Sequence, residues 1–276
     1  MGLTINTNLE AMDAGRNLNS TETMLSQAME RLSSGLRINS AADDVAGYAI
    51  SESLQSQTNG LNQAGENIQD AVALAQTAQG ALNDVNEMLQ RIRELGVEYL
   101  NGTTSEEGKT AIENEMEQLF EEIKRVGETT EFNGTKLLEG AAEIEFQVGP
   151  NEKETIKVEA VELFETDITE TIGENAAELV EKLEEEGAGL KNLTEAIGKV
   201  SESAGTFGAV QDRIQYTLSN LEVYSENLTA AESALTDVNM ATEMTNFTKD
   251  EVLQQAGVAI LAQANQLPDA TLKLLE

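Results

Sequence analysis

Residues 61–92 read LNQAGENIQDAVALAQTAQGALNDVNEMLQRI, a stretch whose apolar residues recur in alternating steps of three and four. The recurring residues are Leu61, Ala64, Ile68, Ala71, Ala75, Ala78, Leu82, Val85, Leu89 and Ile92. This spacing is that of the a and d positions of a heptad repeat, so it predicts a long coiled-coil helix. Because several of these positions hold Ala, the axis of this helix can come close to that of a partner helix.

A second heptad pattern lies near the other end of the chain. Its apolar residues are Leu190, Leu193, Ile197, Val200, Ala204 and Phe207, continued by Ile214, Leu218, Leu221, Leu228 and Leu235. Two long helices whose apolar seams lie far apart in the sequence can bury those seams against each other as an antiparallel pair. The predicted fold is therefore mainly α, a long antiparallel coiled-coil helix bundle built from both chain ends.

Between the two heptad patterns, the sequence predicts a shorter helix and a turn. An apolar stripe of helical spacing runs over residues 112–126. Thr103 or Thr104, each followed three residues later by a glutamate, matches the capping box that begins a helix. After this helix, Asn133-Gly134 predicts a tight turn.

The spacing of apolar residues then changes from helical to alternating. Apolar and polar residues alternate over 144–148 and again over 156–160, with GPNEKE between them. This pattern predicts a small β-hairpin subdomain in the middle of the chain. The predicted organisation has three parts: terminal helices at 1–43 and 238–276, a coiled-coil helical domain at 44–140 and 190–237, and a β-hairpin with an acidic outer segment at 141–189.

The two chain ends carry only thin apolar stripes. Residues 1–43 and 238–276 are rich in Ala, Ser, Thr, Asn and Gln, with thin stripes such as Leu18, Leu25 and Leu32. Ordering each residue costs on the order of 1–2 kcal/mol of backbone entropy, which so little apolar surface does not offset within one chain. The ends are therefore expected to be loose in a monomer and to order when neighbouring copies supply further apolar surface. This is the behaviour of a self-assembling subunit.

Composition and charge exclude several classes of function. The net charge is −33, so binding to nucleic acid or to an anionic membrane surface is not expected. The chain has no His and no Cys, which excludes thiol catalysis, a Ser-His-Asp triad and a His-Glu-x-x-His zinc site. We expect no enzymatic activity, no cofactor and no metal. The first residues, MGLTINTNLEAMDAG, lack the basic and apolar regions of a Sec signal peptide, so we expect export by another route.

One short stretch places two arginines close to two aspartates, in a chain that holds only 17 Lys and Arg residues. Residues 30–51 read ERLSSGLRINSAADDVAGYAIS and hold Arg31, Arg37, Asp43 and Asp44. Two interpretations stay open. The arginines make charge-assisted hydrogen bonds to carboxylates of a neighbouring copy, or they pair locally while Asp43 or Asp44 caps the helix that starts near Val45. Leu82 and Leu218, in the two heptad patterns, complete the residues expected to matter for assembly.

Six stretches of this sequence resemble bacterial flagellin. They are INTN at 5–8, ERLSSGLRINSAADDVAG at 30–47, LQRIREL at 89–95, TTEFNGTKLL at 129–138, NLTAAES at 227–233 and QAGVAILAQANQLP at 255–268. They occur in order and cover both terminal regions. The resemblance implies a structural subunit that polymerises with itself into the extracellular filament of the bacterial flagellum and serves swimming motility. In that family both termini form the inner tube and the middle of the chain faces outwards.

The resemblance also implies partners. The family's subunits are exported by the flagellar type III apparatus, and they meet an export chaperone, the filament cap and junction proteins. In some flagellins the LQRIREL helix contacts the animal toll-like receptor for flagellin; the matching residues here are Leu89, Arg91, Leu95 and, on the next helix, Glu115. Two alternatives stay open, namely a hook–filament junction protein and a secreted coiled-coil adhesin or effector that does not polymerise.

Overall fold

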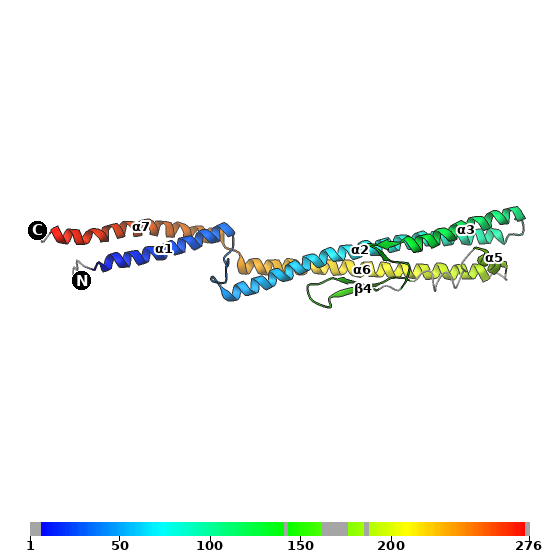
Figure 1. Ribbon diagram of the computed structural model, residues 1–276, viewed down its shortest axis with the longest axis horizontal. Helices are drawn as coiled ribbons and strands as arrows, with labels where there is room; N and C mark the ends of the chain where they lie inside the picture. Colours follow the sequence, from blue (N-terminus) through cyan, green and yellow to red (C-terminus); the bar gives the residue numbers. More distant parts are fainter. Residues whose placement is uncertain (1–6, 141–142, 162–175, 185–187, 274–276) are drawn as a thin grey trace. The chain divides into compact units, whose positions relative to one another are not determined.

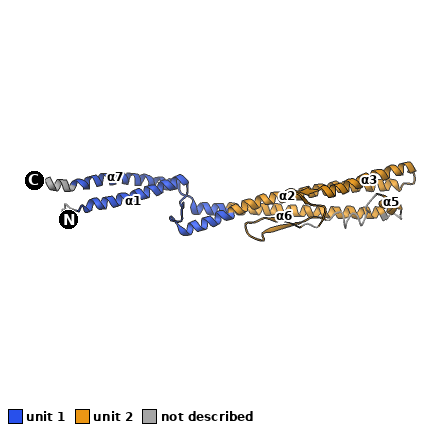
Figure 2. Ribbon diagram, in the orientation of Figure 1, with its two compact units in different colours: residues 1–57, 227–276 blue, residues 58–226 orange. Residues whose placement is uncertain are grey.

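The computed structural model describes residues 7–140, 143–161, 176–184 and 188–273 (Figure 1). Its helices and strands follow the chain in the order α1 (Leu9–Ser34), α2 (Val45–Tyr99), α3 (Glu106–Thr129), β1 (Glu131–Phe132), β2 (Thr135–Lys136), β3 (Glu143–Gln147), β4 (Thr155–Glu159), α5 (Ala176–Glu184), α6 (Ala188–Thr236) and α7 (Met240–Lys273). The chain divides into two compact units, residues 1–57 with 227–276 (unit 1) and residues 58–226 (unit 2), which Figure 2 colours separately. The mainly helical fold predicted from the heptad patterns is confirmed.

In unit 2, α2 and α6 run antiparallel. The side chain of Asn86 donates a hydrogen bond of 3.0 Å to the Ser201 hydroxyl. A β-carbon added at Gly208 would lie 3.7 Å from the Gln79 amide nitrogen. Gln79 lies seven residues before Asn86 on α2, and Gly208 lies seven residues after Ser201 on α6. At one end a β-carbon at Gly65 would contact Leu221, and at the other end one at Gly96 would contact Leu190. The register therefore stays constant along the pair.

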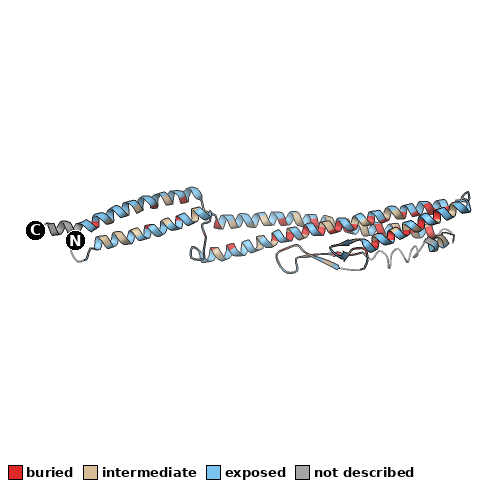
Figure 3. Cartoon of the chain, turned by 45° about the horizontal axis from the view of Figure 1, so that its top comes forward, coloured by how far each residue is buried: buried red, intermediate tan, exposed pale blue. Residues whose placement is uncertain are grey.

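The predicted heptad residues of α2 form the centre of the core of unit 2. All ten apolar residues of the repeat between Leu61 and Ile92 are at most 2% exposed. On α6 the burial is less even: Leu193, Val200, Phe207, Ile214 and Leu221 are buried, whereas Leu190, Ile197 and Leu218 are partly exposed. Figure 3 shows how the buried residues gather in this unit. Because the heptad residues of α2 are more completely buried than those of α6, α2 is the central helix of unit 2.

Helix α3 begins later than the capping box predicts. Its N-cap is Ser105, whose hydroxyl accepts a hydrogen bond from the Gly108 N–H at 3.2 Å. The prediction of Thr103 or Thr104 as the cap is therefore wrong, because the chain turns through 101–104 and first becomes extended at Ser105. Glu106 and Glu107 then occupy the first turn, where negative charge favours the helix dipole. The stripe on α3 packs against the core of unit 2, with Met116 and Ile123 completely covered.

Two short hairpins follow α3. The predicted turn at Asn133-Gly134 joins β1 to β2, and both residues adopt positive φ angles of 50° and 81°, as a tight two-residue hairpin turn requires. The predicted hairpin is β3 paired with β4, in a register that places Ile144 opposite Val158. On its exposed face Lys157 pairs with Glu143 at 2.5 Å and with Glu145 at 2.8 Å. Those two carboxylates hold the pKa of Lys157 above its ordinary value.

Helix α5 lies in a segment where the sequence predicts only an acidic outer stretch. Its Leu179 and Leu183 are 0% and 1% exposed and belong to the core of unit 2, and the helix packs against α3. The acidic run Glu184–Glu186 begins at the end of α5, and its last two residues lie outside the described residues. In the sequence, the feature that could have predicted this helix is the pair Leu179 and Leu183, two apolar residues four positions apart among acidic ones.

In unit 1, α1 and α7 form a second antiparallel pair. The amide of Asn8, at the start of α1, donates to the backbone carbonyl of Ala264 at 2.7 Å. Near the other end of α1, the N–H of Val238 donates to the carbonyl of Gly35 at 2.9 Å. In the described part of this unit, the apolar side chains that reach full burial are Ala28, Ile38 and Ala264. The pair is thus held over a long contact by few buried groups.

Candidate assembly site

The segment between α1 and α2 is a short connection held by several hydrogen bonds. Gly35 ends α1 in the left-handed conformation, with φ 76°, and its N–H donates to the Arg31 carbonyl. Asp43 then accepts hydrogen bonds from the N–H groups of Asn39 and Ser40 and from the Ser40 hydroxyl, at 3.1–3.2 Å. Partial burial opposes ionisation, but these donors together with nearby Arg31 keep the pKa of Asp43 below its ordinary value.

Asp44 caps α2. Its side chain accepts hydrogen bonds from the N–H groups of Ala46 and Gly47 at 3.1 and 3.0 Å. Gly47 lies so close to this carboxylate and to Ile38 that a β-carbon there would come within 2.5 and 2.7 Å of them. The local interpretation, with an aspartate capping the helix that starts at Val45, is confirmed for Asp44.

Arg31 links the two chain ends. Its guanidinium lies 3.9 Å from an oxygen of Asp43 and 3.7 Å from an oxygen of Glu243, which is on α7 and is 8% exposed. Its Nε is buried and has no hydrogen-bond partner among the described residues. Sequence reasoning missed Glu243, because nothing in the local pattern of α7 distinguishes this glutamate from the many exposed ones.

Arg37 binds backbone rather than a carboxylate. Its Nη2 donates to the carbonyl of Leu235 at 2.6 Å, and its own N–H donates to the carbonyl of Thr236 at 2.6 Å. Leu36 and Asp237 form a β-bridge beside these bonds. Arg37 therefore satisfies carbonyls near the C-terminal end of α6, where a cation also favours the helix dipole. A contact of either arginine with a neighbouring copy stays a prediction.

The outer faces of α1 and α7 carry many exposed apolar side chains. On α1 they are Leu9, Met12, Met24 and Met29, and on α7 they are Met240, Met244, Val252, Leu253, Val258 and Ile260. Each of these is at least 42% exposed. A monomeric protein normally leaves such residues scattered, whereas exposed apolar groups that follow the length of a helix pair mark a surface for association.

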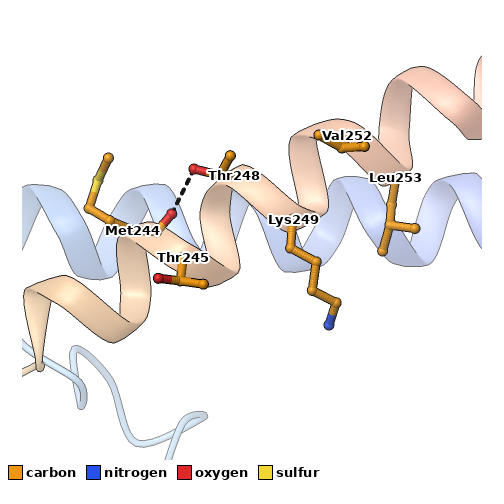
Figure 4. Close-up of a pocket in the computed structure, with 6 residues that line it drawn as sticks. All are labelled: Met244, Thr245, Thr248, Lys249, Val252 and Leu253. Carbon is orange, nitrogen blue, oxygen red and sulfur yellow. Dashed lines mark hydrogen bonds between the residues drawn. The ribbon is translucent and has the colours of Figure 1, made fainter.

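Part of this surface is an open apolar groove along α7 of about 550 Å³. Met244, Thr245, Thr248, Lys249, Val252 and Leu253 line it, as Figure 4 shows. The Thr248 hydroxyl is satisfied within the helix, since it donates to the Met244 carbonyl at 2.9 Å. The groove thus offers an apolar floor with one cation, Lys249, at its side.

The remaining predicted site residues lie in unit 2. Leu82 is completely buried inside the chain, so any effect on assembly would act through the fold of the unit, whereas Leu218 is partly exposed. Of the receptor-like residues, Leu89 and Leu95 are 0% and 1% exposed. Arg91 donates to Glu115 at 2.8 Å across the α2–α3 contact, and this pairing raises the pKa of Arg91. A protein docking on this face would meet the two charged side chains and not the two leucines.

Two further observations concern the described residues alone. Over those ranges, no helix is both long enough and apolar enough to cross a membrane. In the same part of the chain, no three acidic side chains come together in a way that could hold a metal ion.

Comparison with known proteins gives consistent matches along the chain. The model of the bacterial flagellin N-terminal helical region matches residues 5–143, and that of the bacterial flagellin C-terminal helical region matches residues 190–275. A flagellin of Halalkalibacterium halodurans is 45% identical over 272 residues, covering 98% of this chain and 99% of the relative. A flagellin of Bacillus subtilis is 40% identical over 304 residues, covering 98% and 99%. The crystal structure of Bacillus cereus flagellin is 28% identical, with a TM-score of 0.48, and covers 60% of this chain and 94% of that one.

Proposed function

Because this chain belongs to the bacterial flagellin family, it is a structural subunit of the extracellular flagellar filament, and we propose that α1 and α7 supply its main contacts with neighbouring subunits. Motility is the function that the family implies. The observation that carries the proposal is the row of exposed apolar side chains along α1 and α7. Unit 2 buries its apolar seams within one chain and does not need a neighbour to do so.

The finer assignment of parts follows from this proposal. Residues 1–43 and 238–276 form the inner layer of the filament, 44–140 and 190–237 form the coiled-coil domain around it, and 141–189 faces outwards. The distribution of burial supports this order, because exposed large apolar side chains occur more densely along the segments placed innermost than along 44–140 and 190–237. The Arg31–Asp43–Glu243 contacts would then hold α1, the connecting segment and α7 in one arrangement for packing.

The proposal includes the route and partners that the family implies. The chain leaves the cell unfolded through the flagellar type III apparatus, and it meets an export chaperone, the filament cap and junction proteins. It acts as a structural protein and not as an enzyme, with no cofactor. The sparse burial in unit 1 supports such a route, because ends held by few buried groups unfold at low cost. We leave receptor recognition outside the proposal, since two of the four matching side chains are buried.

A matched pair of substitutions tests the assignment of the contacts. Val258 on α7 is 54% exposed, and Val97 on α2 in unit 2 is 56% exposed, so each loses little within the monomer when replaced by Gln. We expect Val258→Gln to raise the critical concentration for seeded polymerisation by about tenfold, the effect of about 1.4 kcal/mol at one contact. Val97→Gln should leave it within about twofold of the parent.

Circular dichroism of both monomers should match the parent, which separates loss of contact from loss of fold. Equal critical concentrations for the two variants would show that α7 does not supply the main contacts. Arg37→Ala tests in the same way the charged residues between α1 and α2: it should slow polymerisation and keep monomer helicity. Arg125→Ala is its control, because among the described residues the ion-pair partner of Arg125 is Glu122, on the surface of the same helix α3.

A further inference from the structure

The methionines of this chain are divided between the two units. On α1, Met12, Met24 and Met29 are 60%, 42% and 50% exposed, and on α7, Met240 and Met244 are 48% and 50% exposed. The two methionines of unit 2 are sheltered: Met116 is 0% exposed and Met88 packs against the core. The most exposed thioethers of the described residues thus coincide with the proposed contact surface.

The three methionines of α1 also point in different directions. At 3.6 residues per turn, Met24 and Met29 lie roughly 120° and 260° around the helix from Met12. Neighbouring helices that pack along the length of α1 from these different sides would therefore each meet one of them. On α7, Met240 and Met244 are four residues apart on one face, and Met244 lines the apolar groove beside Val252 and Leu253.

We propose that these five methionines are oxidation sites at which a peroxide blocks assembly of the free subunit. The inference rests on the proposed function, because it needs the outer faces of α1 and α7 to be buried in the filament. In the step, the thioether sulfur attacks one oxygen of hydrogen peroxide, the S–O bond forms as the O–O bond breaks, and water leaves. The sulfur is oxidised by two electrons and the peroxide is reduced by the same two.

The chemical change opposes packing for a direct reason. A thioether is apolar and adapts to irregular surfaces, whereas a sulfoxide carries a strong dipole whose oxygen needs a hydrogen-bond donor. In the groove, the Thr245 and Thr248 hydroxyls already donate to backbone carbonyls of α7, which leaves Lys249 as the one donor side chain among the lining residues. A sulfoxide buried against Val252 and Leu253 by a neighbouring subunit would lose its hydration, and the apolar side chains around it offer no hydrogen bond in return. Unit 2 would keep its fold, because its methionines are covered.

Whether a subunit is free or assembled then determines whether its methionines can be oxidised. Free subunits expose all five thioethers, and subunits inside a filament cover them. Oxidation should therefore prevent growth of a filament without dissolving the filament that already exists. The modification is reversible, since methionine sulfoxide reductases return the thioether.

The experiment treats purified monomer with hydrogen peroxide, maps each methionine by peptide mass, and measures the critical concentration for seeded polymerisation. We expect sulfoxide at the five methionines of α1 and α7 before Met88 and Met116, and a critical concentration raised at least about tenfold, as an unpaired polar group at each contact requires. Methionine sulfoxide reductase should restore the parent value. The same treatment of filaments should leave these methionines largely unmodified.

A variant with all five methionines replaced by Leu, a swap that conserves volume, should polymerise and resist peroxide. Met88→Leu with Met116→Leu is the control, and it should stay as sensitive as the parent. Polymerisation of fully oxidised monomer at the parent concentration would overturn the inference, and so would a peroxide-sensitive fivefold variant. If the untreated fivefold variant fails to polymerise, the reductase experiment is the test: restored polymerisation of the oxidised parent supports the inference, and no restoration overturns it. Failure of the untreated parent to polymerise would instead refute the proposed function.

Discussion

Leu82→Asp should unfold much of unit 2 and prevent filament formation. Leu82 is 0% exposed in the centre of the α2 seam. The constant register of α2 and α6 places it opposite Ala204, which packs against the same core. So small a neighbour cannot move in to fill the space that a shorter side chain leaves, so the cost lies in the upper part of the range for large-to-small core changes.

The magnitude has two parts. Removing the leucine side chain costs about 3–5 kcal/mol, and leaving a carboxyl group without a buried partner adds about 1–3 kcal/mol. For a unit of this size each 1 kcal/mol lowers the melting temperature by roughly 2–4 °C, so the thermal midpoint should fall by roughly 8–32 °C. Since domains are stable by only about 5–15 kcal/mol, much of the reserve is lost.

Thermal unfolding followed by circular dichroism measures the effect, with two controls. Leu82→Asn has nearly the same shape as Leu82→Asp but no ionisable group, and Glu87→Gln changes an exposed residue on the same helix. Burial would raise the pKa of the introduced carboxyl, so the deficit of Leu82→Asp relative to Leu82→Asn should grow as pH rises above about 4 and vanish below it. Midpoints within about 2 °C for Leu82→Asp and Glu87→Gln would refute the heptad assignment.

Three further outcomes are expected. Limited proteolysis of the monomer should remove much of residues 1–43 and 238–276 and leave a stable fragment, whereas filaments should keep both ends; resistance of the monomer's ends would contradict coupled folding. The pKa of Asp43, measured by NMR, should lie below its ordinary value of 3.8. Its hydrogen bonds to Asn39 and Ser40 should then be lost as pH falls through that lowered pKa, which amide exchange would report. The critical concentration should fall steeply between about 0.05 M and 1 M sodium chloride, because the Debye length shortens several-fold; a flat response would place the carboxylates away from the contacts.

The sequence predicted best those features that repeat. The α2 seam spans many turns, so errors at single positions average out, and every residue of the repeat between Leu61 and Ile92 is buried. The turn at Asn133-Gly134 was predicted because few residues accept positive φ. The N-cap of α3 was not predicted correctly, because three neighbouring residues, Thr103 to Ser105, all carry a hydroxyl that could cap the helix. The backbone conformation determines which of them is the cap, and local composition does not reveal that conformation.

Long-range contacts of single residues could not be predicted. Arg31 meets Glu243 because α1 and α7 are antiparallel with a particular register, and that register depends on the whole length of both helices. Arg37 was expected to meet a carboxylate, and it donates to the Leu235 carbonyl instead, since a helix end offers several unpaired acceptors. The exposed faces of α1 and α7 could be expected from their thin apolar stripes, but which methionines stay uncovered needed the structure.

The contrast between the two units explains how one chain can be both foldable and assembly-dependent. Unit 2 buries two long seams and a side helix, so it closes its core without a partner. In unit 1, α1 has 26 residues and α7 has 34 residues. In the described part of this unit, including the segment that connects α1 to α2, the fully buried apolar side chains are those of two alanines and Ile38. At on the order of 1–2 kcal/mol per ordered residue, such a pair gains too little from its own contacts, and the free energy for ordering it has to come from neighbouring subunits. We therefore expect loose ends in the free subunit and a strong polymer as two results of the same distribution of apolar residues.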